Sequence, residues 1–161
     1  MSEWNNFFVA TASASAALTG LIFVGVSISL AKILSFKQLP NRAIISLLLL
    51  FTILAVSMLM LMPVQSFMSA GITALCTGCL MLALVIQTDM SSIKASKQTE
   101  YYKHHLLNML YNQIAIWPYI IGGIVMLING NTGLCWVAAA FIFSFIKAVL
   151  DAWVLLVEIN R

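Results

Sequence analysis

The sequence contains very few charged residues. Only 8% of its 161 residues are Asp, Glu, Lys or Arg, whereas about 25% are charged in an average soluble domain. A soluble domain of this length could not cover its apolar surface with so few charges, so the composition excludes a soluble or disordered chain. The chain also lacks a basic run long enough to follow phosphates, which excludes nucleic acid as a partner.

The sequence has only three cysteines, and all of them lie in apolar stretches, which excludes a secreted disulfide scaffold. Cys76 and Cys79 form a C-x-x-C motif, but no second cysteine pair or nearby histidine accompanies it. A Ser/His/Asp set, an H-E-x-x-H motif and a phosphate-binding glycine loop are absent as well. We therefore expect no enzyme activity, no metal site and no cofactor.

Hydrophobic residues make up 62% of the chain and give it a mean hydropathy of +1.03. A helix needs roughly 20 consecutive apolar residues to span a bilayer. Five segments meet this requirement, so the sequence predicts an all-α integral membrane helical bundle that forms a single domain over residues 1–161. The five predicted transmembrane helices cover about 7–34, 43–62, 67–87, 106–128 and 134–157.

Apart from Lys147 in the last predicted helix, Lys and Arg lie at alternate ends and connections of this predicted bundle. They lie at the end of the first helix and just after it, in the longer polar loop at 88–105, and at the C-terminus. The N-terminal tail and the two short turns contain none. Because positively charged loops stay on the cytoplasmic side, five helices allow only an outside N-terminus and an inside C-terminus. The 88–105 loop is then cytoplasmic, and its sequence leaves open a weakly specified helix within it.

The last predicted helix carries charged residues at membrane depth. Its polar residues have the spacing i, i+3, i+7 and i+14 and are Ser144, Lys147, Asp151 and Glu158. This spacing places them in one stripe, and a charge near the bilayer centre costs about 2.5–3.5 kcal/mol on insertion scales. Either Lys147 and Asp151 neutralise each other, or the stripe lines a wet path or a subunit contact. Three amides at the inner end of the fourth helix could satisfy the stripe: Asn108, Asn112 and Gln113.

The first predicted helix is rich in small residues. They recur at every fourth position in two rows, which consist of Ala12, Ala16 and Gly20 and of Ser15 and Thr19. Such rows let two helix backbones approach closely, and their hydroxyls can form hydrogen bonds across the contact. The rows are therefore a packing seam within the subunit, a seam between subunits or the lining of a pore.

The fourth predicted helix contains Pro118, which is followed closely by Gly122 and Gly123. Proline removes one backbone hydrogen bond and kinks a helix. A kink at membrane depth can mark a gate or a binding site, but it also occurs in ordinary packed helices.

The opening segment 7–27, FFVATASASAALTGLIFVGVS, resembles a group of small bacterial multi-helix inner-membrane proteins of unassigned function. The segment 152–158, AWVLLVE, is similar to the endings of the same group. Some members carry an automatic label of membrane-protease modulator. The resemblance covers mainly the first and last helices, and it implies a multi-pass protein of the bacterial inner membrane.

These features favour a homo-oligomeric pore or transport-type protein for an ion or a small solute. In this interpretation Lys147, Asp151 and the hydroxyls of the first helix face the oligomer axis or an internal wet cavity. The alternative is a regulatory or accessory interaction subunit of a larger membrane complex, which the small size and the lack of a soluble domain favour. Besides the lipid bilayer, the expected partners are further copies of the chain or another membrane protein.

Overall fold

The computed structural model describes residues 2–35, 39–63, 66–96 and 102–159, with side chains for all of these except 2, 91–96, 102–105 and 158–159. Every regular element in these ranges is a helix, so the predicted all-α fold class is confirmed. In chain order the elements are η1 (Ser2–Trp4), α1 (Asn5–Ile28), α2 (Leu30–Ser35), α3 (Leu39–Met60), α4 (Phe67–Ser96), α5 (Tyr102–Asn129), η2 (Gly130–Thr132) and α6 (Gly133–Ile159), where η marks a 3-10 helix.

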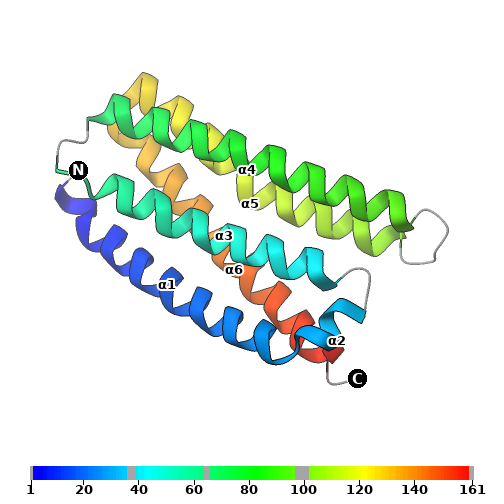
Figure 1. Cartoon of the computed structure of the whole chain (residues 1–161). Coiled ribbons are helices and arrows are strands. Elements are labelled where there is room, and N and C mark those ends of the chain that lie inside the picture. The colour runs from blue at the N-terminus through cyan, green and yellow to red at the C-terminus, as the bar shows by residue number, and fades with distance from the viewer. Residues whose placement is uncertain (1, 36–38, 64–65, 97–101, 160–161) are drawn as a thin grey trace.

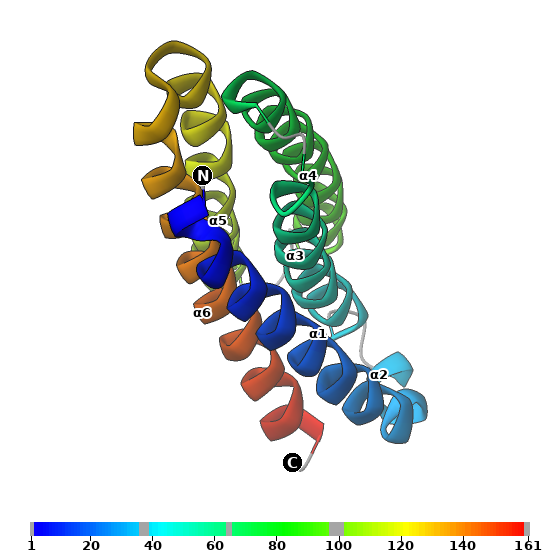
Figure 2. The same cartoon turned by 90° about the vertical axis from the view of Figure 1, so that its left-hand side faces the viewer.

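Four of the long helices form a ring in which each helix packs against the two beside it. The order around the ring is α3, α4, α5 and α6, and α6 closes the ring by packing on α3 (Figure 1). The remaining long helix, α1, lies outside the ring and runs along α3 and α6 (Figure 2). Every helix of the ring therefore has two long neighbours, whereas one side of α1 faces away from the other described helices.

The two ends of the bundle contain different parts of the chain. The start of α1, the end of α3, the start of α4 and η2 lie together at one end, here named the η2 end (Figure 1). At the opposite end, named the α2 end, lie α2, the starts of α3 and α5, and the ends of α4 and α6. Lys32 of α2 and Arg42 of α3 belong to the α2 end.

Four stretches of the described chain are long and apolar enough to cross a membrane: Asn5–Ile28, Leu39–Met60, Phe67–Met90 and Leu106–Val157. The last stretch is 52 residues long because it takes α5, η2 and α6 together. The chain reverses direction at η2, where Gly130 has a φ of +61°, a conformation that glycine adopts without strain (Figure 1). The helix lengths and composition are therefore those of a membrane protein.

The prediction of one helix over 7–34 is wrong, because the structure divides this segment into α1 and α2 at Ser29. Glycine at position 25 has a low helix propensity and precedes the break by one turn. The hydroxyl of Ser27 donates to the carbonyl oxygen of Phe23 at 2.8 Å, and such bonds bend helices. A conformationally weak turn thus separates the apolar span from the short α2 helix.

The prediction of a loop over 88–105 is also wrong for the described part of that segment. α4 continues through Ser96 and α5 starts at Tyr102, while residues 97–101 lie outside the described residues. α4 extends past the end of its apolar run because its buried face continues into the polar stretch, where Asp89 is only 5% exposed. The end of an apolar run therefore does not mark the end of α4.

Glycines bring α5 close to both of its neighbours. A Cβ added at Gly123 of α5 would lie 2.6 Å from Cγ of Leu75 and 2.9 Å from the carbonyl oxygen of Gly71, both on α4. A Cβ added at Gly133, the first residue of α6, would lie 2.6 Å from the carbonyl oxygen of Gly122. Only glycine fits at these two positions, so the closest helix contacts occur within α4, α5 and α6.

Candidate functional site

The polar stripe predicted on the last helix faces the interior of the subunit. Ser144, Lys147 and Asp151 of α6 are at most 5% exposed, and the ammonium of Lys147 forms an ion pair with the carboxylate of Asp151 one turn further on. The backbone of Glu158 lies in the last turn of α6, but its side chain lies outside the described ones. The stripe is therefore covered by other helices of the same chain.

α5 supplies the second partner of the buried lysine. Nζ of Lys147 donates a hydrogen bond to Oδ1 of Asn108 at 3.1 Å. This contact confirms for Asn108 that an amide of this helix satisfies the stripe. The ammonium thus lies between a carboxylate and an amide oxygen, which offsets part of the cost of removing it from water.

A second carboxylate is buried on α4. Asp89 is 5% exposed, and Nδ2 of Asn112 on α5 donates to its two oxygens at 3.0 and 3.1 Å. Sequence reasoning assigned Asp89 to a solvated loop and missed it. The sequence signal for Asp89 was its spacing, because it continues the buried face of α4. That face consists of Ala70, Ala74, Gly78, Met81, Val85 and Asp89. A carboxylate on the buried face of a membrane helix is costly and points to a function.

Two buried amide atoms have no hydrogen-bond partner among the described residues. They are Oδ1 of Asn112 and Nε2 of Gln113, which are neighbours on α5. Asn112 itself is completely buried. An unpaired buried polar atom is costly, so each such atom in a native structure needs an explanation, such as a bound water, an ion or a proton.

Further polar contacts continue from this region toward the middle of the bundle. The hydroxyl of Ser144 donates to the carbonyl oxygen of Ala115 at 3.4 Å, and its Oγ lies 3.3 Å from the hydroxyl oxygen of Tyr119. Tyr119 is 1% exposed and was not singled out from the sequence. Ala115 precedes Pro118 by one turn, and α5 remains helical through Pro118. A hydroxyl from a neighbouring helix can satisfy backbone groups that a membrane proline disturbs.

These residues, all buried except the half-buried Asn108, form one connected set, here named the polar column, which runs from the α2 end to the middle of the bundle. Its members are Asp89, Asn108, Asn112, Tyr119, Ser144, Lys147 and Asp151. On α5 its residues have the spacing i, i+4 and i+11, so they share a helix face. Three helices thus contribute polar groups to one interior region.

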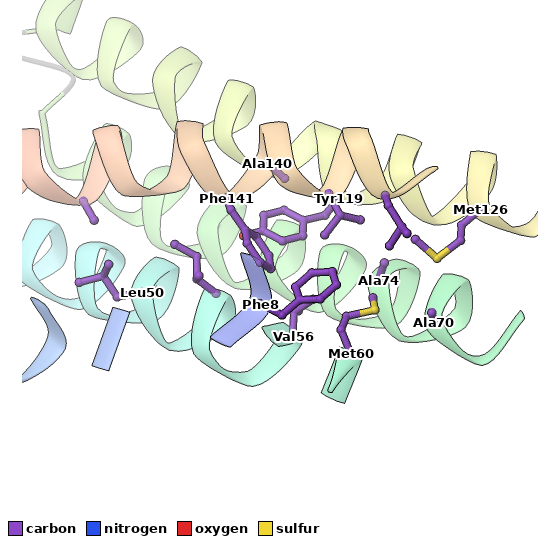
Figure 3. Packing of buried hydrophobic residues seen from close by; sticks show 14 residues of the cluster. Phe8, Leu50, Val56, Met60, Ala70, Ala74, Tyr119, Met126, Ala140 and Phe141 are labelled. Carbon is purple, nitrogen blue, oxygen red and sulfur yellow. The ribbon is translucent and has the colours of Figure 1, made fainter. Parts of the chain in front are cut away.

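Aromatic side chains lie beside Tyr119, at the end of the polar column in the middle of the bundle. The ring of Phe141 lies 5.9 Å from that of Tyr119 and 6.2 Å from that of Phe8 (Figure 3). Phe7 and Trp4 extend this group, with Phe7 stacked on Phe141 at 6.0 Å. We name Trp4, Phe7, Phe8 and Phe141 the aromatic cluster. It fills the interior where the polar column ends.

The charges around the polar column balance. Arg42 of α3 repels the ammonium of Lys147 electrostatically, and Asp89 attracts it in addition to its ion-pair partner Asp151. Two cations and two carboxylates from three helices therefore act on one region. Such balanced groups can lower the cost of burial, but they also give the interior several places at which a charge can reside.

The small-residue rows of α1 lie mostly outside the packed interior. Among the row residues Ser15 is buried, Ala12 and Thr19 are half-buried, and Ala16 and Gly20 are exposed. A Cβ added at Gly20 would meet no atom within 4 Å. The rows thus form little of the seam within the subunit.

The buried contact of α1 with α3 continues the row of Ser15 and Thr19 by one turn toward the start of the helix. The hydroxyl of Thr11 donates to the carbonyl oxygen of Phe8 at 3.1 Å, and its Oγ1 lies 2.9 Å from Oγ of Ser57. A groove of about 140 Å³ between α1, α2 and α6 has an apolar lining that includes Gly25 and Leu155. α1 is therefore attached firmly at its start and less closely toward its end.

The described residues contain no group of three or more His, Cys, Asp and Glu side chains that could hold a metal ion. The expected absence of a metal, a cofactor and a catalytic set remains a prediction. Comparisons of the chain with protein-family models, with curated proteins and with solved structures find no match. The residues and their geometry therefore carry the functional argument alone.

Proposed function

We propose that the chain crosses the bacterial inner membrane five times, with its N-terminus outside and its C-terminus in the cytoplasm. In support, α1, α3, α4, α5 and α6 are 22 to 30 residues long. At 1.5 Å per residue such helices extend about 33–45 Å, enough for a hydrocarbon core of about 30 Å. Counting α5 and α6 separately gives five spans, and the basic residues Lys32 and Arg42 lie at the α2 end.

Labelling of single cysteines in intact cells tests this orientation. In a variant without native cysteines, Asn131→Cys in η2 should react with a membrane-impermeant maleimide. Gln98→Cys, in the basic connection between α4 and α5, should react only after the cells are opened. The opposite pattern would invert the orientation, and labelling of both positions from outside would contradict the odd number of spans.

We infer that the chain moves an ion or a small solute across the membrane through the interior of each subunit. The observation that supports this most is the polar column, which buries three charged or amide side chains on α5 and α6 alone: Asn112, Lys147 and Asp151. Polar groups inside a membrane bundle usually mark an ion or substrate path. Because Lys147 and Asp151 are covered by their own chain, an internal path has more support than one along an oligomer axis.

The polar column and the aromatic cluster suggest how such a path is kept closed. The column offers hydrogen-bonding groups from the α2 end as far as Tyr119, and Phe8 and Phe141 fill the interior beside that residue (Figure 3). Apolar constrictions close a pore by excluding water. The interior is then a half-path that is open to exchange on the cytoplasmic side and closed toward the outside.

Flux from reconstituted vesicles tests the proposal. The double variant Lys147→Met/Asp151→Leu removes both charges without leaving either one unpaired, and it should fold and lose ion flux. Ser13→Ala is a matched control because the Ser13 hydroxyl is exposed and only bonds back to Val9 of its own helix. Unchanged flux in the double variant, or wild-type flux equal to that of empty vesicles, would refute the proposal.

An accessory subunit is the second candidate, and the outward side of α1 favours it. Only 11% of the span of α1 is buried, against 56% of the span of α3. Gly20 and Gly25 on this helix leave open space, which would let another helix approach closely. We expect that helix to come from a second copy of the chain or from another membrane protein.

The mass of the protein in nanodiscs, with lipid subtracted, separates the two candidates when it is combined with the flux measurement. Ion movement by the purified chain, as a monomer or as a homo-oligomer, supports the transport proposal. A monomer that shows no flux and co-purifies with a second membrane protein supports the accessory subunit. Gly20→Leu should disrupt either association if α1 forms the contact, whereas Ala14→Leu, also exposed but six residues earlier and thus on a different side of the helix, should not.

A further inference from the structure

We propose that Asp89 and Asn112 together form a proton-binding site, and that the proton is the ion that moves through the polar column. This inference rests on the proposed transport function and names its substrate. It is argued from two observations on neighbouring atoms: a buried carboxylate whose oxygens both accept from one amide, and the unpaired oxygen of that same amide.

The contact between Asp89 and Asn112 satisfies the ionised carboxylate but leaves one end of the amide without a partner. Nδ2 of Asn112 donates to both oxygens of Asp89, at 3.0 and 3.1 Å. The other end of the same amide, Oδ1, is an acceptor that is fully buried and has no donor among the described residues. A carboxylate has no proton to donate, so the ionised pair cannot satisfy this atom.

A proton on Asp89 would supply the missing donor. The proton binds to one carboxylate oxygen, no other bond breaks, and the resulting O–H group can donate to Oδ1 of Asn112. Nδ2 continues to donate to the second oxygen of Asp89. A small rotation of the two side chains then gives a cyclic acid–amide pair with two hydrogen bonds, in which both ends of the amide are satisfied. The pair thus has a bonded arrangement for each protonation state.

The surrounding charges favour a proton over a metal cation at this point. Among the described residues, Arg42 of α3, Asp89 of α4 and Asp151 of α6 act electrostatically on Lys147, while Asn108 and Asn112 of α5 contribute amides to the same region. The ammonium of Lys147 already forms an ion pair with Asp151 and occupies the position that a metal cation would take there. A metal cation at Asp89 would also require oxygen ligands, whereas the amide nitrogen of Asn112 faces both carboxylate oxygens. Proton uptake needs no change in ligand number.

Proton uptake would also change the electrostatics of the polar column. Asp89 attracts Lys147 when it is ionised, and this attraction ends when the proton binds. Lys147 then depends more strongly on Asp151, its ion-pair partner. Proton binding at Asp89 thus changes the electrostatic environment of the next charged pair along the path, Lys147 and Asp151, as a proton relay through a membrane requires.

Infrared difference spectroscopy of the purified protein in nanodiscs tests the site independently of any flux. When the pH is lowered, the wild-type protein should gain a carbonyl stretching band of a protonated carboxylic acid. Asp89→Asn should lose one component of this band, while the components from the other four Asp and Glu residues remain, and Asp89→Glu should keep the lost component at a shifted frequency. Asn112→Leu should keep the band but move it to higher frequency, because the acid loses its amide partner. Identical carboxylic-acid bands in the wild-type protein and in a folded Asp89→Asn protein would overturn the inference.

Proton flux into vesicles that contain a pH-sensitive dye completes the test. Wild-type protein and Asp89→Glu should acidify the interior under an imposed gradient, while Asp89→Asn should match empty vesicles. Flux of sodium or potassium without proton movement would overturn the proton site and leave the proposed transport function intact. If no ion moves at all, the transport proposal fails, and the infrared band alone decides whether Asp89 binds a proton.

Discussion

α1 and the α4–α5–α6 part of the ring both contain small residues, but they use them differently. In α5 a Cβ at Gly123 would lie 2.6 Å from Leu75 of α4, so the missing side chain makes the helix contact possible. In α1 a Cβ at Gly20 would meet no atom within 4 Å. A small residue therefore marks a surface on which a backbone can approach, but it does not say whether the approaching helix belongs to the same chain.

The two regions also differ in the partners of their polar side chains. The α4–α5–α6 part buries two carboxylates and a lysine, and each makes a hydrogen bond or ion pair to another side chain. The hydroxyls of α1 mostly donate to the backbone of their own helix, as Ser13 and Thr19 do. Side-chain bonds between helices therefore hold the polar column together, whereas α1 is held mainly by apolar contacts at its start.

The largest effect is expected from Asp151→Leu. This change leaves the buried ammonium of Lys147 without its carboxylate, and breaking a buried ion pair costs about 3–5 kcal/mol. The free energy of unfolding in mixed micelles measures the loss. The double variant Lys147→Met/Asp151→Leu should recover most of it, because neither charge remains. A loss below about 1 kcal/mol in the single variant would show that Lys147 reaches water, as exposed pairs contribute only that much.

Overpacking of the glycine contacts should come next. Gly133→Ala places a methyl group 2.6 Å from the carbonyl oxygen of Gly122 and 2.6 Å from the amide nitrogen of Met126, and backbone atoms cannot move aside easily. Such overpacking costs about 1–3 kcal/mol. Gly123→Ala should behave similarly, and the same unfolding measurement in micelles applies to both. Unchanged stability in both variants would contradict the close approach of α5 to its neighbours.

A smaller effect is expected where α1 makes its buried hydrogen bond to α3. Thr11→Val keeps the side-chain volume but removes the contact with Ser57, which measures 2.9 Å. Hydrogen bonds between membrane helices contribute about 0.6 kcal/mol on average, so we expect a loss of that size. Ser13→Ala removes an exposed hydroxyl from the same helix and serves as the control. A loss above about 2 kcal/mol would show that α1 is bound as tightly as the helices of the ring.

The sequence alone was sufficient for the fold class, for the approximate helix positions and for the stripe on α6. Composition and the length of apolar runs determine the first two, and the spacing of Lys147 and Asp151 determines the third. Asp89 was missed because hydropathy falls just before it, although the buried face of α4 continues to that residue. The periodicity of the buried face was the better guide there, since helix geometry does not stop where the apolar run stops.

The break at Ser29 and the position of the tight glycine contacts between helices could not be derived in the same way. Hydropathy is continuous across Ser29, and the break depends on local hydrogen bonding near Ser27. The row Ala12, Ala16 and Gly20 has a stronger four-residue pattern than the glycines of α4 and α5. Nevertheless the closest backbone contacts lie at Gly123 and Gly133, because contact requires complementary small residues on two helices rather than a regular row on one.

The smallest effect is expected from Gly20→Ala, which is the counterpart of the glycine variants of α5 and α6. The new methyl group meets open space within the subunit, and alanine is a better helix former than glycine. The unfolding free energy of the monomer in micelles should therefore change by no more than about 0.5 kcal/mol, or rise slightly. If the same variant weakens a homo-oligomer in nanodiscs while the monomer keeps its stability, the open side of α1 is an intersubunit contact. If monomer stability falls by as much as in Gly133→Ala, α1 packs as closely as α5 does, and the contrast between the two regions is wrong.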